Sequence, residues 1–313
     1  MRTDDKARST SGWTWVHIVG LMAVFAALLA GCGDNGSEVG SGDRSAEDCP
    51  APDDGAGGLL AEARQQGFLQ VGFANEVPYG YEGPDGKPTG QAPEVAREVL
   101  CRLGVPELRG TVVDFGGLIG GLNAGRYDMI AAGMFINPER AAQVSFTDPD
   151  YCGTTAFAVA EGNPLGLTDF ESVTESEARL GVMNGAVEDE YAVDSGVSDS
   201  QISRFSSTPD LFDALRAGRI DAVALTEVTV QEQVKDLPGF EATEGFVPVI
   251  DGEEQLGCGG YAFRKENQEL RDRFNEVLNE MKQNDEILPI IEQFGFSEAS
   301  VEKAKETTVE DLL

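Results

Sequence analysis

Hydrophobic and polar residues follow the same pattern at two places along this chain. The segments 118–130 and 211–223 both read L-x3-L-x-A-G-R-x-D and continue into apolar residues. The two leucines of each copy are one helical turn apart, which predicts an apolar helix face. The glycine is typical of a helix end, and the apolar residues after the aspartate predict a buried strand. The copies start 93 residues apart, about the length of a small α/β lobe, so we predict two similar lobes with a cleft between them.

The apolar spacing elsewhere predicts strands and helices in alternation, which is typical of a mainly parallel sheet. We therefore predict an α/β protein of two lobes, each a mainly parallel sheet flanked by helices, joined by two hinge crossings. The first lobe comprises residues 59–154 plus 261–313, and the second lobe comprises residues 155–260. The predicted strands are 68–73, 111–113, 129–131, 180–183 and 220–225, the crossings are 154–160 and 257–263, a loop is expected at 133–137, and helices are expected at 59–66, 92–103, 187–193, 228–234, 269–282 and 287–294.

The first 31 residues predict an export signal. Basic residues precede an apolar run at 16–30, which is too short to favour a membrane-spanning helix. The run ends in Leu29-Ala-Gly-Cys32, which resembles the bacterial lipobox, in which the cysteine is lipidated and becomes the new N-terminus. We therefore expect a lipoprotein signal peptide at 1–31 and a chain anchored through Cys32 to the outer face of the cell membrane. An ordinary secretory signal or a retained anchor is the alternative, and each of them also exports the chain.

Residues 32–58 are rich in Gly, Asp and Ser and predict a flexible tether. Over the whole chain, 55 acidic residues stand against 23 basic ones, for a net charge of −32. No basic patch interleaved with aromatic residues is visible, which argues against nucleic acid as a partner. The acidity has two interpretations that stay open: an ordinary solvated surface, or a protein that works in high salt, where charges are screened.

Four cysteines remain besides Cys32, and an even number favours disulfides in an exported protein. Four cysteines allow three connectivities. Cys152 and Cys258 lie at the two predicted crossings, so we predict that they pair. Cys49 would then tie the tether to the helix that carries Cys101. Buried free thiols are the alternative.

The single histidine, His17, lies inside the predicted signal peptide. The mature chain therefore lacks the residue needed for Ser-His-Asp or Cys-His catalysis and for histidine ligation of a metal. A Gly-rich phosphate loop of the Walker type is also missing from the sequence. We expect neither enzymatic activity nor a metal or cofactor.

Ligands of open α/β sheets bind beyond the carboxyl ends of the strands. A guanidinium at such a position can bind a carboxylate through two parallel hydrogen bonds. Aromatic faces can hold a delocalised cation, and carboxylates can accept hydrogen bonds from its N–H groups. The alternatives to ligand binding are ordinary core packing and solvent exposure. For Arg140, a further alternative is pairing with Glu139 or Asp148. The candidate residues at the predicted strand ends are Glu76, Tyr79, Phe115, Phe135, Arg140 and Glu188.

The middle of the chain resembles a known family. The sequence Leu-Asn-Ala-Gly-Arg-Tyr-Asp at 122–128, Pro-Glu-Arg at 138–140 and Phe-Thr-Asp-Pro-Asp-Tyr at 146–151 are similar to the central stretch of the solute-binding proteins of ABC importers, in the family that mostly takes up polar amino acids. The resemblance extends from about Leu59 to Phe296. It implies the type II periplasmic-binding-protein fold and a monomer that delivers a small molecule to a membrane permease energised by a separate ATPase.

Within this family the chain resembles the binders of ectoine and hydroxyectoine, through residues 73–79, 131–140, 249–252 and 257–259. The amino-acid binders usually carry Ser or Thr at the positions of Gly133, Phe135 and Asn137, which hold an α-carboxylate. They also usually carry an aspartate near Thr226, which holds the α-ammonium group. That aspartate is missing here unless Glu227 substitutes for it. Ectoine, a cyclic amidinium with a carboxylate, has no free ammonium group and fits these departures.

The resemblance implies a role for each candidate. Arg140 pairs with the ligand carboxylate, and Gly133 contributes a backbone contact. Tyr79, Phe115 and Phe135 enclose the ring, although the subgroup can carry a tyrosine in place of either phenylalanine. Glu76 and Glu188 accept hydrogen bonds from the ring nitrogens. The expected function is uptake of a compatible solute under osmotic stress.

Three alternatives remain. The first is a binder of a polar or cationic amino acid, against which the missing aspartate argues. The second is a dehydratase of prephenate-like substrates on the same fold, with Glu188 as the acid, and the absence of histidine argues against it. The third is a sensor ectodomain, which is less favoured because no transmembrane or signalling segment follows Phe296.

Overall fold

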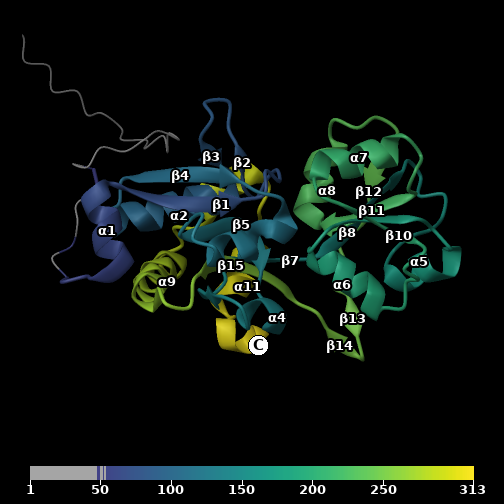
Figure 1. Ribbon diagram of the computed structural model, residues 1–313. Helices are drawn as coiled ribbons and strands as arrows, with labels where there is room; N and C mark the ends of the chain where they lie inside the picture. The colour runs from purple at the N-terminus through teal and green to yellow at the C-terminus, as the bar shows by residue number, and fades with distance from the viewer. Residues whose placement is uncertain (1–47, 50–51, 53) are drawn as a thin grey trace, which may run out of the picture. The chain divides into compact units, whose positions relative to one another are not determined.

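The computed structural model describes residues 48, 49, 52 and 54–313 (Figure 1). The predicted signal peptide, the lipidation site Cys32 and most of the predicted tether lie outside the described residues. Among the residues that are described, no helix combines the length and the apolar character needed to cross a membrane.

The first sheet has three parallel strands next to an antiparallel one. Strand β1 pairs in parallel with β4 and β5, and β15 then runs antiparallel to β5, β6 and β7. The order along the sheet is β4-β1-β5-β15-β6, with β7 also paired to β15. The strands are β1 (Phe68–Phe73), β4 (Glu107–Val112), β5 (Met129–Phe135), β6 (Ser145–Phe146), β7 (Tyr151–Gly153) and β15 (Gly257–Phe263).

The second sheet repeats this order. Its strands run β10-β9-β11-β8-β12, with β9 parallel to β10 and β11 and with β8 antiparallel to β11 and β12. The crossing strands β8 and β15 thus occupy equivalent places, which makes both sheets mixed and limits the predicted parallel order to three strands in each. The strands are β8 (Thr155–Ala160), β9 (Leu180–Met183), β10 (Ile202–Phe205), β11 (Ala222–Thr226) and β12 (Phe240–Ala242).

Helices flank each sheet, and we call each sheet with its helices a lobe (Figure 1). Two small hairpins, β2–β3 (Tyr81–Glu82, Pro88–Thr89) and β13–β14 (Val249–Ile250, Glu253–Glu254), lie apart from the sheets. The described helices of the first lobe are α1 (Gly58–Gln66), α2 (Gln91–Arg102), η1 (Phe115–Gly117), α3 (Leu118–Asn123), α4 (Pro138–Ala141), α9 (Gln268–Gln283), α10 (Leu288–Ile291), η2 (Glu292–Phe294), α11 (Glu298–Lys305) and η3 (Val309–Leu312), and those of the second are α5 (Phe170–Ser176), α6 (Val187–Asp194), α7 (Thr208–Arg216) and α8 (Glu227–Val234).

The repeated sequence pattern folds the same way twice. Gly125 after α3 and Gly218 after α7 have φ values of 70° and 66°, the left-handed conformation that glycine adopts without steric cost. The amide of Gly125 bonds to the carbonyl of Leu122, and the amide of Gly218 bonds to that of Leu215. Strands β5 and β11 follow. The structure therefore confirms the helix, the glycine turn and the strand predicted for each copy.

Some predicted boundaries are wrong. Residues 133–135 are not a loop, because β5 continues to Phe135 through its pairing with β15, where Gly259 lies opposite Phe135. Strand β4 begins at Glu107, four residues before the predicted start, along its pairing with β1. The proposed boundary between residues 260 and 261 falls inside β15, all of which belongs to the first sheet.

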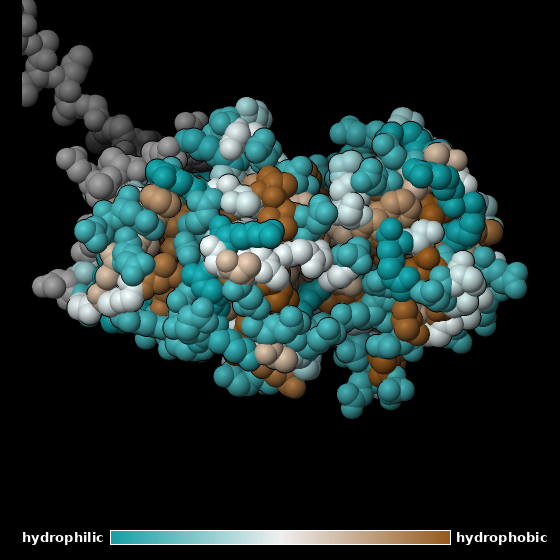
Figure 2. Space-filling view, in the orientation of Figure 1, coloured by the Kyte–Doolittle hydropathy of each residue, from teal (hydrophilic) through white to brown (hydrophobic). Residues whose placement is uncertain are grey.

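Hydrophilic residues cover most of the face shown in Figure 2, and its apolar residues occur in small groups. The exposed large hydrophobic side chains lie far apart along the chain, at Val112, Leu165, Val193, Val249 and Leu313. Single exposed apolar residues are normal on a folded protein.

Both predicted cysteine pairs are bonded in the structure. Cys152 lies opposite Cys258 in the β7–β15 ladder, and their sulfur atoms are 2.05 Å apart. The bond therefore joins the two segments that lead to and from the second lobe, and it does so within the first sheet. Cys49 is bonded to Cys101 on α2, with an S–S distance of 2.02 Å.

Loss of either disulfide should destabilise the protein. The closed loops span 106 and 52 residues, for which chain entropy gives a stabilisation of about 5 and about 4 kcal/mol. We expect Cys152→Ser/Cys258→Ser and Cys49→Ser/Cys101→Ser to lower the free energy of unfolding by about these amounts in denaturant titrations followed by circular dichroism. Both tryptophans lie in the predicted signal peptide, so tryptophan fluorescence is unsuitable. Four titratable thiols in the exported wild-type protein would contradict the pairing.

Candidate functional site

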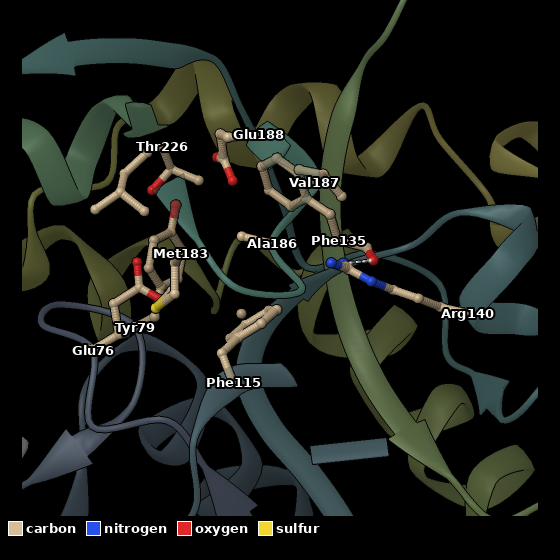
Figure 3. Close-up of a pocket in the computed structure, with 12 residues that line it drawn as sticks. Glu76, Tyr79, Phe115, Phe135, Arg140, Met183, Ala186, Val187, Glu188 and Thr226 are labelled. Atoms are coloured by element: carbon tan, nitrogen blue, oxygen red, sulfur yellow. Dashed lines mark hydrogen bonds between the residues drawn. The ribbon is translucent and has the colours of Figure 1, made fainter. Parts of the chain in front are cut away.

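A small cavity is lined by residues from both lobes (Figure 3). It contains about 320 Å³ of space not filled by atoms, part of it open to solvent. All seven residues predicted from the sequence contribute to its wall. The lining residues are Glu76, Tyr79, Phe115, Gly133, Phe135, Arg140, Met183, Ala186, Val187, Glu188, Leu225 and Thr226.

Tyr79 is held against the backbone of β5. Gly133 has a φ of 62°, and a Cβ atom at that position would lie 2.2 Å from Cδ1 of Tyr79, so a glycine is required on both counts. The carbonyl of Gly133 accepts a hydrogen bond of 2.6 Å from the Tyr151 hydroxyl. Gly133 thus lets the Tyr79 ring approach the strand, and its carbonyl already has a protein partner.

The glycines of β15 make room for two further rings. A Cβ atom at Gly257 would lie 2.1 Å from the Phe135 ring, and one at Gly259 would lie 2.2 Å from the Tyr151 ring. Tyr151 contacts both Phe135 and Tyr79, with ring centroids 6.0 and 5.2 Å apart. The aromatic wall is therefore fixed by packing within the first lobe. Tyr151 lies in the family motif at 146–151 but is not among the predicted site residues.

Arg140 already bonds to both lobes. Its Nη1 donates to the carbonyl of Phe135 at 2.7 Å, and its Nη2 donates to the carbonyl of Gly185 in the second lobe at 2.9 Å. Asn137 caps α4 by accepting a hydrogen bond from the Arg140 amide. The side chain is buried, and burial lowers the pKa of its guanidinium. These bonds to described residues use two of its five N–H donors, and the others can serve a ligand.

The expected alternatives for Arg140 are not seen. Asp148 instead accepts hydrogen bonds from Asn275 and Asn279 of α9, and Arg140 bonds to neither Glu139 nor Asp148 in the described structure. The Cζ atom of Arg140 lies 5.5 Å from the centroid of the Phe115 ring. The guanidinium therefore belongs to the cavity wall.

Two buried carboxyl groups face the cavity from opposite lobes. Glu76 follows β1, and Glu188 lies in the first turn of α6. Burial, followed by repulsion from Glu188, raises the pKa of Glu76 to about 8, and burial raises the pKa of Glu188 to about 7. Oε1 of Glu188 has no hydrogen-bond partner among the described residues, whereas Oε1 of Glu76 accepts a bond of 3.0 Å from Thr229. A buried acceptor without a partner is costly unless a ligand supplies a donor.

Figure 3 shows Glu76 and Arg140 on opposite sides of the cavity, with the side chain of Glu188 pointing into it. One side of the cavity therefore presents carboxyl oxygens and the other presents guanidinium N–H groups. The wall between them is apolar and aromatic. Such an arrangement suits a small zwitterion whose positive group carries N–H donors.

The second lobe contributes lining residues that are not among the predicted site residues. Met183 is the last residue of β9, and Thr226 is the last residue of β11. Their places at the carboxyl ends of strands are the signal that could have identified them. Glu227 does not replace the missing aspartate, because its Oε2 accepts a 2.6 Å hydrogen bond from Thr154 and it does not line the cavity. Thr226 does line the cavity. Within the described chain, no group of three or more His, Cys, Asp or Glu residues could hold a metal ion.

The chain belongs to the bacterial extracellular solute-binding proteins, family 3, whose family model matches residues 69–297. It is a solute-binding component of an ABC transporter for amino acids or similar small molecules. Proteins of this class bind their ligand outside the cytoplasm and work with a permease and an ATPase.

Individual relatives carry more specific descriptions. The chain is 34% identical over 256 residues to the probable amino-acid ABC transporter periplasmic-binding protein y4tE of Sinorhizobium fredii, covering 81% of this chain and 85% of that one. It is 27% identical over 215 residues to the L-arginine-binding protein of Pseudomonas aeruginosa, covering 66% of this chain and 79% of that one.

Among solved structures, EhuB in complex with hydroxyectoine matches with a TM-score of 0.74 and 36% identity, over 81% of this chain and 97% of that one. An ancestral arginine-binding protein bound to arginine matches with a TM-score of 0.63 and 29% identity, over 73% of this chain and 98% of that one. An ancestral amino acid-binding protein described as a precursor of cyclohexadienyl dehydratase, at 23% identity, shares the fold. These likenesses establish the two-lobed periplasmic-binding fold that the sequence predicts.

The buried carboxyl of Glu76 should make the ligand-free protein less stable as the pH rises. Its pKa is about 8 in the folded state and 4.5 as the reference value, so the folded protein holds the extra proton between these values and stability falls across this window. We expect Glu76→Gln to be about 1–3 kcal/mol more stable than the wild type at pH 8 and equal to it at pH 4.5. Denaturant titrations at both pH values measure this difference, and Glu82→Gln, an exposed control on β2, should behave as the wild type. Equal pH profiles for all three proteins would refute the argument.

Replacement of Gly133 should disturb the aromatic wall. In Gly133→Ala the new methyl group meets the Tyr79 ring, and the residue keeps a left-handed φ. We expect a loss of about 1–3 kcal/mol of stability, as for other overpacked buried sites, together with weaker ligand binding. Gly120→Ala is the control, because a Cβ at that position has no atom within 4 Å. Thermal unfolding of both variants should separate them clearly, and equal midpoints would contradict the packing shown here.

Proposed function

We propose that this protein captures ectoine or hydroxyectoine between its lobes and delivers it to a membrane permease. The observation that carries the proposal is the composition of the cavity wall: two buried carboxyls, three aromatic faces and one guanidinium, together with Thr226. The family's amino-acid binders usually carry an aspartate near this position. A positive charge in this cavity would contact aromatic faces as well as oxygen atoms. A delocalised amidinium suits both.

Each candidate residue then has a role that its position supports. Glu76 and Glu188 accept hydrogen bonds from the ring nitrogens, and the unpartnered Oε1 of Glu188 gains a donor. Tyr79, Phe115 and Phe135 contribute about 0.5–2 kcal/mol for each face that contacts the cation. Arg140 uses its remaining N–H groups to bind the ligand carboxylate. The likeness to EhuB bound to hydroxyectoine supports the same assignment.

Ligand-dependent closure follows from the two-lobed site. Contacts between the lobes already include the bonds from Arg140 to Gly185 and from Thr229 to Glu76. Closure without ligand also buries two acidic groups that repel each other. A cation that contacts both carboxyls removes this cost, so it favours the closed state over the open one.

The remaining expectations complete the proposal. We infer that the chain is exported, lipid-anchored through Cys32 and monomeric. We also infer that its lobes correspond to residues 59–154 plus 261–313 and 155–260, apart from the whole of β15, which we assign to the first lobe. The acidic surface agrees with a role in osmotic stress.

A cationic amino acid is the second candidate. The relatives include arginine-binding proteins, and the guanidinium of arginine is also a delocalised cation with N–H donors. It would suit the same carboxyls and aromatic faces. Its α-ammonium group, however, would lack the aspartate that the family's amino-acid binders use near Thr226.

Calorimetric titration distinguishes these candidates. We would titrate residues 32–313 carrying Cys32→Ser with ectoine, hydroxyectoine, glycine betaine, arginine and glutamine. We expect binding of the ectoines alone. Arg140→Ala should weaken it by about thirtyfold or more, because a buried charged partner is removed. Phe135→Leu, which keeps an apolar side chain but removes one aromatic face, should weaken it by about two- to thirtyfold.

Arg109→Ala, an exposed control on β4, should bind as the wild type does. Heat from arginine together with none from the ectoines would replace the proposed ligand with an amino acid.

A further inference from the structure

We propose that Thr226 and Thr229 determine ligand specificity. With Glu76 they form a hydrogen-bonded chain that makes the Thr226 hydroxyl an acceptor for an N–H group of the ligand. This proposal deepens the proposed function and rests on it only in taking the cavity as the ligand site.

The chain of hydrogen bonds crosses between the lobes. Oγ1 of Thr226 donates to Oγ1 of Thr229 at 3.2 Å, and Oγ1 of Thr229 donates to Oε1 of Glu76 at 3.0 Å. Thr229 is completely buried, and Glu76 is 5% exposed. Thr226 lines the cavity. The chain thus begins at the cavity wall of one lobe and ends at a carboxyl of the other.

The direction of these hydrogen bonds determines whether the Thr226 hydroxyl can donate to a ligand or accept from it. A hydroxyl has one proton and two acceptor lone pairs. When Glu76 is ionised it can only accept, so Thr229 must give its proton to Glu76 and Thr226 must give its proton to Thr229. The Thr226 oxygen then has only lone pairs left for the cavity.

The helix that follows does not use these lone pairs. Thr226 is the N-cap of α8, a position where the side-chain oxygen normally accepts a hydrogen bond from an amide in the first turn. Asn137, Asp169 and Ser207 do so at the starts of α4, α5 and α7. Thr226 makes no such bond. Its acceptor capacity is therefore available to the ligand.

The other groups that face Glu76 do not change the direction of the hydrogen bonds from Thr226 through Thr229 to Glu76. Glu188 of α6 is a second acceptor, and Thr229 is the donor on α8. Tyr79 and Tyr151 lie close by as neutral phenols, because burial raises the pKa of each. The Tyr79 hydroxyl faces Thr226 without a hydrogen bond of ordinary geometry. Even if it donated there, the second lone pair of Thr226 would remain.

This end of the cavity should therefore select for ligands with several N–H donors. Glycine betaine, whose quaternary nitrogen has no N–H group, would give no hydrogen bond to Thr226 or Glu188 and would leave Glu76 with Thr229 as its donor. Sites built to hydrogen-bond a substrate reject analogues that lack the group. The ratio of ectoine to glycine betaine affinity measures this selection.

The experiment compares Thr226→Val and Thr229→Val with Thr226→Ser and Thr229→Ser, which keep the hydroxyls. Titration calorimetry with ectoine and with glycine betaine should show that each valine variant lowers ectoine affinity about tenfold or more. Affinity for glycine betaine should stay unchanged, and the serine variants should retain the selectivity of the wild type. Ectoine binding by the wild type with equal selectivity in all four variants would overturn this inference and leave the proposed function standing.

A second readout needs no ligand. Thr229 donates to the ionised form of Glu76, so its loss should raise the pKa of that carboxyl further. The fall in stability starts near pH 4.5 in all of these proteins, and it should extend to higher pH in Thr229→Val but not in Thr229→Ser. If the wild type binds arginine and not ectoine, the proposed function fails, and this pH shift still tests the chain. A folded Thr229→Val protein whose stability stops falling at the same pH as that of the wild type would overturn it.

Discussion

The closed arrangement of this protein depends on how two buried carboxyl groups are neutralised. Glu76 and Glu188 come from different lobes and meet in one small cavity, where burial raises the pKa of both. Among the described residues of the cavity wall, the cationic side chain is Arg140, which lies across the cavity from Glu76 and bonds to backbone carbonyls. Closing the empty cavity therefore means either protonating the carboxyls or accepting their repulsion. A positively charged ligand neutralises the two carboxyls, so its binding favours the closed state through electrostatics alone.

The rest of the site is built before any ligand arrives. Glycines at 133, 257 and 259 allow the rings of Tyr79, Phe135 and Tyr151 to lie directly on backbone, and Phe296 packs edge-on against Tyr79 and Tyr151. Rings held this way lose little freedom on binding, so their contact with a cation is not offset by ordering. The first lobe thus provides a rigid aromatic wall, whereas the second provides Glu188, Thr226 and the Gly185 carbonyl. Recognition is divided between a fixed surface and a set of polar groups that arrive on closure.

Much of this could be predicted from the sequence because the relevant signals are local. The repeated L-x3-L-x-A-G-R-x-D pattern encodes a helix, a glycine turn and a strand, and strand ends carry the cavity residues of an open sheet. The errors come from pairing between distant segments. Residues 133–135 look like a loop, and they are a strand because β15, more than a hundred residues later, lies beside them. The hydrogen-bonded chain from Thr226 to Glu76 was equally hidden, since Thr229 and Glu76 are 153 positions apart and meet only across the lobes.

The disulfide between Cys152 and Cys258 has a mechanical consequence. It joins the outgoing and returning segments at one register position of the β7–β15 ladder, within the first sheet. Two separate connections would let the lobes twist and slide as well as bend. Fastened side by side, the two segments behave as a single ribbon, which bends across its width far more easily than it shears. The bond therefore restricts the open protein to a narrow range of orientations, and fewer of these have to be abandoned when the lobes meet.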